Sequence, residues 1–233
     1  MSRGLGDVYK RQSYFVDKTL DFLKRHKGEP CFVNLWPDDM HTPWVPSQKT
    51  MDSERTSWTT PPNFKEVLTE YDKQIGRLME GLTKLGLEKN TIVIFTSDNG
   101  PAPSFQQMRT NSLLGVKCSL YEGGIRMPFA IHWPEKIKAG GINDSSIVCA
   151  VDLLPSLCAL TGAKLPLDME LSGEDMSTAL LGEPQIRKKD LMWDFGRNKA
   201  FNYPRGKNAK QKSPHLVIRR GSMKLLVDSW DCL

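Results

Sequence analysis

Residues 91–100, TIVIFTSDNG, and residues 115–128, GVKCSLYEGGIRMP, are the most informative part of this sequence. The apolar run in the first stretch predicts a buried strand. This run ends in a polar cluster that contains Asp98 and Asn99, and ligand sites in open α/β sheets form beyond the carboxyl ends of strands. The oxygens of Asp98 and Asn99 are therefore placed where a hard cation would bind. Lys117 follows in a glycine-flanked segment, and the combination indicates a site for an anionic, oxygen-rich group.

The apolar pattern on either side of this stretch predicts an α/β fold. Residues 63–85 repeat apolar side chains with the 3.6-residue period of a helix. Short apolar runs at 31–36 and 91–96 flank that helix and predict strands. A helix between two such strands is typical of a layered α/β unit with a largely parallel sheet. A further strand is expected at 127–133 and a short helix at 151–160.

The two ends of the chain differ from its middle. Residues 1–12, MSRGLGDVYKRQ, are polar and glycine-containing, and we interpret them as a non-native scar. A helix is predicted over 13–26, with Ser13 as its candidate N-cap. From residue 182 to 233 we expect the start of a small, incomplete antiparallel subdomain, because strand patterns at 215–219 and 223–227 flank Gly221 and predict a hairpin.

Composition restricts the function classes. The chain has 233 residues, 39% of them hydrophobic and 25% charged, which is typical of a globular protein with one sizeable core. No apolar run approaches the roughly 20 residues needed to span a bilayer, and the N-terminus lacks a signal-peptide core. Five cysteines without a C-x-x-C pair indicate neither a zinc site nor a dense disulfide framework.

The net charge of +5 is concentrated in the basic stretch 187–224. Twelve Lys or Arg side chains fall there against two Asp. A solvated surface loop is favoured over a surface that attracts an anionic polymer. Nucleic acid is not an expected partner, since no helix-turn-helix, zinc-finger or RNA-recognition signature accompanies the charge.

The T-S-D-N-G turn, the K-x-S-L-Y-E-G-G-x-R-x-P segment and the spacing between them resemble the sulfatase family, of the arylsulfatase-like, formylglycine-dependent type. The resemblance extends over about residues 13 to 228. It implies an alkaline-phosphatase-like α/β sandwich, with a mostly parallel sheet flanked by helices, and hydrolysis of sulfate esters. Residues 13–181 would be the C-terminal part of the catalytic domain, and the chain is interpreted as truncated at both ends.

The resemblance also assigns site residues. Asp98 and Asn99 would bind a divalent cation, usually Ca²⁺, although an Asx-type turn after a strand would favour the same residues. Lys117 would contact the sulfate and stabilise the charge that builds as the S–O bond breaks. His41, in D-M-H-T-P-W, would reach the sulfate and donate a proton to the leaving-group oxygen.

The remainder of the second segment is expected to support the structure. Gly123 and Gly124 would permit unusual backbone angles. Glu122 and Arg126 could form a charge pair that holds the loop. Cys118 departs from the family pattern, in which a small residue such as glycine is common at this position.

The family nucleophile has no counterpart in this sequence. Formylglycine is made from Cys or Ser in C/S-x-P/A-S-R, and no Cys or Ser here begins that motif. Asp38 and Asp39 resemble the family's upstream aspartate pair but lie in the loop that carries His41, which we call the histidine loop. We therefore assign them no metal role. We expect the formylglycine in a missing upstream region, and we expect this chain alone not to turn over a sulfate ester. Its remaining oxygen donors are too few for a tight calcium site.

Two alternatives stay open. The chain could belong to a phosphate or phosphonate ester hydrolase of the same superfamily, which the identity of the nucleophile would reveal. It could also be a non-catalytic anion-binding module that uses the basic stretch. By family analogy the expected substrate is a sulfated small molecule or glycan, and the expected location is periplasmic or extracellular. The sequence does not indicate an oligomeric state.

Overall fold

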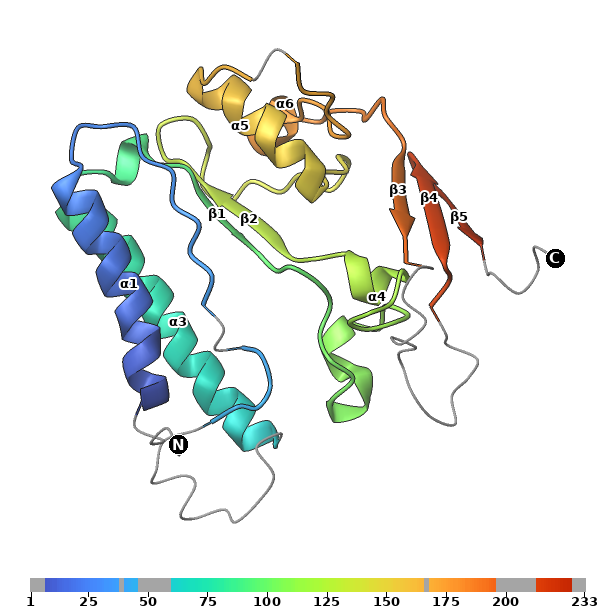
Figure 1. Cartoon of the computed structure of the whole chain (residues 1–233), viewed down its shortest axis with the longest axis horizontal. Coiled ribbons are helices and arrows are strands. Elements are labelled where there is room, and N and C mark those ends of the chain that lie inside the picture. The colour runs from blue at the N-terminus through green and yellow to red at the C-terminus, as the bar shows by residue number, and fades with distance from the viewer. Residues whose placement is uncertain (1–6, 38–39, 46–59, 166–167, 196–212, 228–233) are drawn as a thin grey trace. The chain divides into compact units, whose positions relative to one another are not determined.

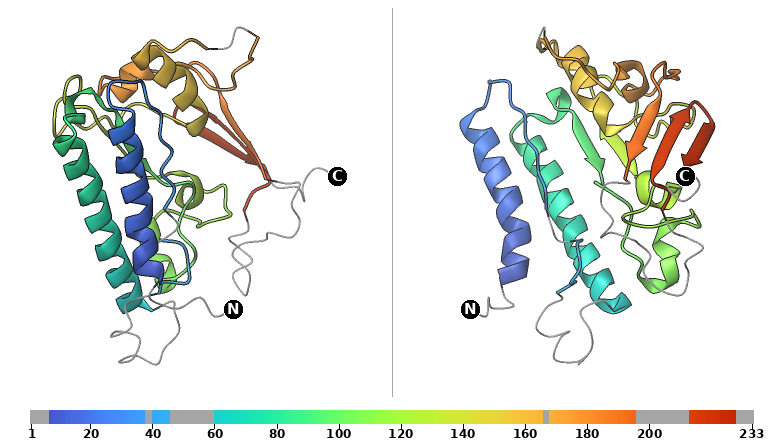
Figure 2. Two further views of the ribbon diagram at one scale, coloured as in Figure 1. Left: turned by 60° about the vertical axis from the view of Figure 1, so that its left-hand side comes forward. Right: turned by 45° about the vertical axis from the view of Figure 1, so that its right-hand side comes forward.

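The computed structural model describes residues 7–37, 40–45, 60–165, 168–195 and 213–227, and the chain divides into two compact units, 1–91 and 92–233 (Figure 1). The first unit is built on two helices, α1 (Asp7–Arg25) and α3 (Pro61–Lys84). They lie side by side in the views of Figures 1 and 2. A Cβ atom on Gly81 of α3 would lie 2.4 Å from a methyl carbon of Leu20, so this glycine lets the two helices approach closely.

The helix boundaries follow local signals only in part. α3 begins after Thr60, whose hydroxyl accepts a hydrogen bond from the Asn63 N–H at 3.4 Å, and Pro61 occupies the first turn. α3 is followed by Gly86, whose φ of +71° is the left-handed conformation in which helices commonly end. α1 begins at Asp7 and not at Ser13, so the predicted N-cap is wrong. A short 3₁₀ helix, η1 (Glu88–Asn90), follows α3.

Residues 31–36 do not form the predicted strand. The structure assigns them no strand pairing, and the side chains of Phe32 and Trp36 are 74% and 80% exposed. An apolar run indicates that a segment is suited to a sheet, but a strand forms only where a neighbour completes its backbone hydrogen bonds. The sequence pattern carries no information about that neighbour.

The second unit begins with an antiparallel pair, β1 (Val93–Thr96) and β2 (Phe129–His132). Val93 pairs with His132, and Thr96 pairs with Phe129. Both strands were predicted, but their antiparallel pairing was not. The connection 97–128 contains only two short helical segments, η2 (Phe105–Thr110) and α4 (Glu122–Ile125), and lacks the long crossover helix that joins parallel neighbours.

The chain continues through η3 (Ala150–Asp152), α5 (Leu153–Thr161) and α6 (Ser177–Leu180). A second antiparallel sheet has the order β3-β4-β5, formed by β3 (Leu191–Asp194), β4 (Leu216–Arg220) and β5 (Met223–Val227). The predicted hairpin is confirmed as β4–β5, and β3 adds a third strand to it. Strand pairing throughout the described ranges is antiparallel, so the expected parallel sheet is not among them.

The core of the second unit gathers apolar side chains from its loops, helices and sheets. Its buried members include Val116, Leu120, Trp133, Met176, Leu180, Leu191 and Val217. Two of them, Val116 and Leu120, belong to the 115–128 segment, so this segment is anchored from within the unit. Among the helices that the structure describes, none is long and apolar enough to cross a membrane.

Candidate functional site

The turn after β1 presents the two predicted metal ligands. Asp98 is exposed and Asn99 is half-buried. The Ser97 hydroxyl lies 3.0 Å from the Asn99 carbonyl oxygen and 3.5 Å from Asp98 Oδ1, and it donates a hydrogen bond that tightens the turn. A carboxylate and an amide therefore stand at the end of a strand, as the sequence predicts.

Backbone contacts hold this turn against the segment that carries Lys117. The Gly100 N–H donates to the Gly124 carbonyl at 2.9 Å, and the Lys117 N–H donates to the Pro101 carbonyl at 2.9 Å. The structure therefore brings three of the four predicted site residues onto one scaffold. The two segments, 97–101 and 115–124, thus form a pair of interlocked loops.

Glycine is required in the interlocked loops for close approach. A Cβ atom on Gly100 would lie 2.0 Å from the Gly123 carbonyl oxygen, and one on Gly124 would lie 2.0 Å from the Ser119 carbonyl oxygen. Neither Gly123 nor Gly124 has a positive φ, so the expectation of unusual backbone angles at this pair is wrong. The positive φ instead occurs at Gly115 (+87°).

Cys118, next to Lys117, has a φ of +65°. This left-handed region is unfavourable for residues with a Cβ atom and open to glycine. The structure thus gives a physical reason why a small residue suits this position, and why Cys118 is a departure with a conformational cost.

We expect the substitution Cys118→Gly to stabilise the second unit by up to about 1 kcal/mol, because relief of the left-handed strain exceeds the added entropy of the unfolded chain. Urea unfolding of the two proteins measures the difference. A lower unfolding midpoint for the glycine variant would show that the thiol makes contacts worth more than the strain.

Glu122 opens α4 and binds cations from the C-terminal sheet. The Lys224 ammonium donates to Glu122 Oε1 at 2.7 Å, and Arg219 Nη1 lies 3.7 Å from Oε2. Burial tends to raise the pKa of Glu122. The hydrogen bond and charge of Lys224, followed by the charges of Arg219 and Arg126, outweigh burial and leave this pKa lowered. The expected Glu122–Arg126 pair is therefore corrected, since Arg126 contributes only the smallest of these effects.

His41 belongs to the first unit. It is exposed, and its Nδ1 atom lies 2.8 Å from the Thr42 carbonyl oxygen. Three residues later, fully buried Trp44 donates from Nε1 to the Met40 carbonyl at 3.1 Å and packs against Phe64 of α3 at 5.0 Å between ring centroids. These contacts anchor the histidine loop to α3. Asp38 and Asp39 lie outside the described residues.

The donors on the interlocked loops suit a hard cation in kind. Asp98 supplies carboxylate oxygens and Asn99 an amide oxygen, whereas Ca²⁺ takes six to eight oxygen ligands. Within the part of the chain that the structure describes, no group of three or more His, Cys, Asp or Glu could hold a metal ion. Asp98 and Asn99 by themselves offer too few oxygen donors for such an ion.

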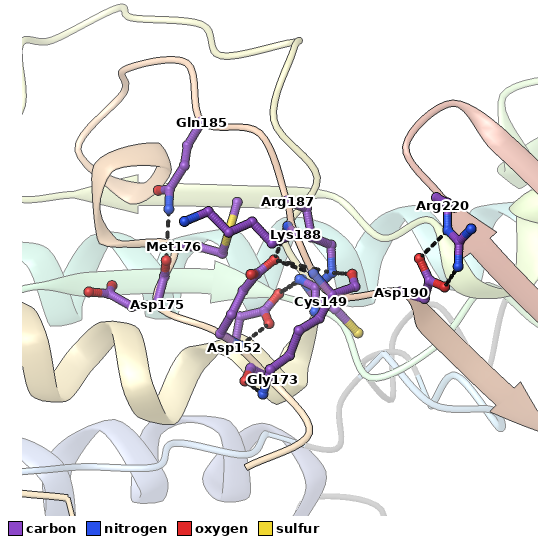
Figure 3. Close-up of polar contacts among 12 residues, drawn as sticks. Cys149, Asp152, Gly173, Asp175, Met176, Gln185, Arg187, Lys188, Asp190 and Arg220 are labelled. Carbon is purple, nitrogen blue, oxygen red and sulfur yellow. Dashed lines mark hydrogen bonds and ion pairs between the residues drawn. The ribbon is translucent and has the colours of Figure 1, made fainter.

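The basic stretch is partly built into the fold. Arg187 pairs with Asp152 in the interior, and Arg220 pairs with Asp190 at the surface (Figure 3). The other engaged cations are Lys189, which donates to the carbonyls of Leu171 and Gly173, and Arg219 and Lys224, which bind Glu122. The preferred interpretation as a solvated loop is wrong for Arg187, Arg219 and Lys224, whose side chains are 4%, 27% and 16% exposed, whereas Arg220 is 83% exposed and stays at the solvated surface. The basic residues between 197 and 212 lie outside the described ranges.

The fold and the interlocked loops define an α/β protein with a candidate anion site, and comparison with known families gives its relationship. A family model described as Sulfatase matches residues 9–163, and one described as N-sulphoglucosamine sulphohydrolase, C-terminal, matches residues 116–230. The chain belongs to the sulfatase family. The resemblance seen in the sequence motifs is therefore confirmed.

Curated relatives support this relationship. An N-acetylgalactosamine-6-O-sulfatase of Bacteroides thetaiotaomicron is 32% identical over 188 residues, covering 76% of this chain and 35% of that protein. Arylsulfatase A of Homo sapiens is 38% identical over 134 residues, covering 56% of this chain and 25% of that protein. The chain thus spans about a third or less of the length of these relatives.

Comparison with solved structures supports the same family relationship. A structure from work on glycosaminoglycan metabolism by Bacteroides thetaiotaomicron matches with 27% identity and a TM-score of 0.67, over 91% of this chain and 42% of that one. A structure of i-CgsB bound to a neocarrahexaose matches with 25% identity and a TM-score of 0.67, over 97% of this chain and 46% of that one. These matches confirm the alkaline-phosphatase-like α/β class.

Proposed function

We propose that this chain is part of an enzyme that hydrolyses sulfate esters of a sulfated carbohydrate. The observation that carries the proposal is the pair of interlocked loops, because their backbone hydrogen bonds hold Asp98 and Asn99 on the same scaffold as Lys117. Support for the substrate class comes from a relative named for N-acetylgalactosamine 6-sulfate and from a matching structure with a bound carbohydrate.

The proposed roles follow from side-chain chemistry. Asp98 and Asn99 would hold a divalent cation such as Ca²⁺, which would supply positive charge beside the sulfate. Lys117 would bind the sulfate and stabilise negative charge on the departing oxygen. His41 would donate a proton to that oxygen, and the contact of its Nδ1 with the Thr42 carbonyl fixes the orientation of its ring.

The nucleophile is proposed to come from residues other than these 233. A formylglycine in C/S-x-P/A-S-R would form the covalent sulfate ester, and this motif is absent from the printed sequence. The chain by itself is then inactive. By family analogy, the enzyme acts in the periplasm or outside the cell.

The experiment reads the in-frame coding sequence upstream of Ser13 and assays the resulting protein on an N-acetylgalactosamine sulfate and on the matching phosphate ester. We expect sulfate hydrolysis that falls at least about a hundredfold in Lys117→Met, because one charge-stabilising donor is lost. Lys138→Met, at an exposed position of the same unit, is the matched control and should keep full activity.

A preference for the phosphate ester, with a Ser or Thr nucleophile, would replace the sulfatase proposal with its superfamily alternative. Polyanion binding that falls with salt, without hydrolysis by the extended protein, would favour the non-catalytic module. The second alternative is less favoured, because five cations of the basic stretch already bind partners within the chain.

A further inference from the structure

The C-terminal sheet contacts the segment that carries Lys117 through two facing cations. Arg219 of β4 and Lys224 of β5 are direct cross-strand partners, so their side chains leave the same face of the sheet. Both reach Glu122, and the Lys224 ammonium also donates to the Leu120 carbonyl at 2.9 Å. The carboxylate of Glu122 therefore forms an ion pair with one cation from each strand of the hairpin.

A second contact fixes the same point of the segment. The Leu120 N–H donates to the Ser213 hydroxyl oxygen at 3.0 Å. Leu120 is 5% exposed, so its backbone groups have little access to water and depend on these partners. Because Ser213 and Lys224 satisfy both of them, the conformation of residues 115–124 depends on the C-terminal segment, about a hundred residues away in the chain.

We propose that Glu122 is a positioning residue, which holds the Lys117 loop to strands β4 and β5 and makes the C-terminal sheet a structural part of the sulfate site. The role of this site rests on the proposed function. The mechanical link between the sheet and the loop does not rest on it, and the two can be tested apart.

The test measures amide hydrogen exchange in the purified chain and in Lys224→Met, which keeps the side-chain stem and removes the charge. We expect exchange at Gly100, Lys117 and Gly124 to become about tenfold faster, since a charge-assisted hydrogen bond is lost. Lys224→Arg keeps the charge and can still donate a charge-assisted hydrogen bond, so the exchange rates of these amides should stay within about twofold of those in the parent. Arg220→Met, which breaks an exposed pair on the neighbouring strand β4, should leave these amides unchanged.

A pH series distinguishes a specific positioning role of Glu122 from a general contribution to stability. The lowered pKa of Glu122 means that its link is intact above the ordinary pKa of a glutamate and is lost as the pH falls through the lowered value. In the parent protein, the protection of the Gly124 amide, corrected for intrinsic exchange, should decrease over that pH range. Glu122→Gln should be less protected throughout and show no such step.

Unchanged exchange at Gly100, Lys117 and Gly124 in Lys224→Met would overturn the proposal. Equal acceleration across β3, β4 and β5 would also overturn it, because the cation would then stabilise the sheet and not the loop. If the link is found but Lys117→Met retains sulfate hydrolysis, the proposed function fails while the positioning role of Glu122 stands.

Discussion

Replacing Gly124 with alanine is expected to destabilise the second unit by about 3 kcal/mol or more. The new Cβ atom would lie 2.0 Å from the Ser119 carbonyl oxygen and 2.6 Å from the Val116 carbonyl oxygen. Both obstacles are backbone atoms, so no flexible side chain can move aside. To relieve the clash, the backbone at residue 124 would have to move away from the carbonyl groups of Val116 and Ser119. This movement would weaken the hydrogen bond from Gly100 to Gly124 that joins the interlocked loops.

Urea unfolding measures this effect, and Gly141→Ala is the matched control in the same unit. A Cβ atom on Gly141 would meet the Lys138 carbonyl oxygen at 3.5 Å, an ordinary contact, and its φ is not positive. We expect the control to change the free energy of unfolding by about 0.5 kcal/mol or less. Comparable effects of the two substitutions would contradict the close packing of the loops.

Sequence reasoning succeeded where the decisive signal is local. The apolar run at 93–96, the polar turn with Asp98 and Asn99, and the hairpin of β4 and β5 each depend on a few adjacent residues. The structure places these elements where the pattern puts them. The assignment of Asp98 and Asn99 to a metal stays a prediction, because no group of three or more His, Cys, Asp or Glu in the described residues could hold a metal ion.

Reasoning from sequence failed where the partner is distant. Nothing near Glu122 indicates that its cations come from Arg219 and Lys224, which lie about a hundred residues further along the chain. Arg126 was the nearest charge and therefore the natural candidate. For the same reason, the strand pattern at 31–36 could not show that the segment has no paired strand among the described residues, and the apolar runs could not specify antiparallel pairing.

The number of charges in the basic stretch likewise could not show which of its side chains have distant partners. A run of Lys and Arg resembles a solvated surface whether its members bind water or carboxylates. Arg187 shows the difference, since its side chain is 4% exposed and faces Asp152, whose side chain is fully buried. This pair makes the 182–195 segment part of the fold.

Asp152 is the centre of a buried hydrogen-bond network (Figure 3). Its Oδ2 atom accepts hydrogen bonds from Arg187 Nη1 and from the Cys149 N–H at 2.8 Å, and its Oδ1 atom accepts one from the Glu174 N–H at 3.0 Å. One carboxylate thus ties the start of η3, the loop before α6 and the segment that leads to β3.

Replacing Asp152 with alanine is expected to destabilise the second unit by about 3 kcal/mol, the lower end for a broken buried ion pair, because the guanidinium of Arg187 loses the nearer of its two carboxylate partners and keeps only Glu174, at 3.8 Å. Two backbone N–H groups lose their acceptor at the same time. The double variant Asp152→Ala with Arg187→Met also removes the buried guanidinium that Asp152 neutralised, and it should recover part of the loss. Chemical unfolding of the four proteins of this cycle measures the coupling between the two side chains.

Asp190→Ala is the matched control, because it breaks an ion pair whose arginine, Arg220, is 83% exposed. Water and salt replace such a partner readily, so the control should unfold at nearly the same urea concentration as the parent. If Asp152→Ala were as mild as Asp190→Ala, water or the neighbouring carboxylate of Glu174 would have to compensate Arg187 in the folded protein. The buried ion pair would then not be what fixes residues 182–195 to the fold.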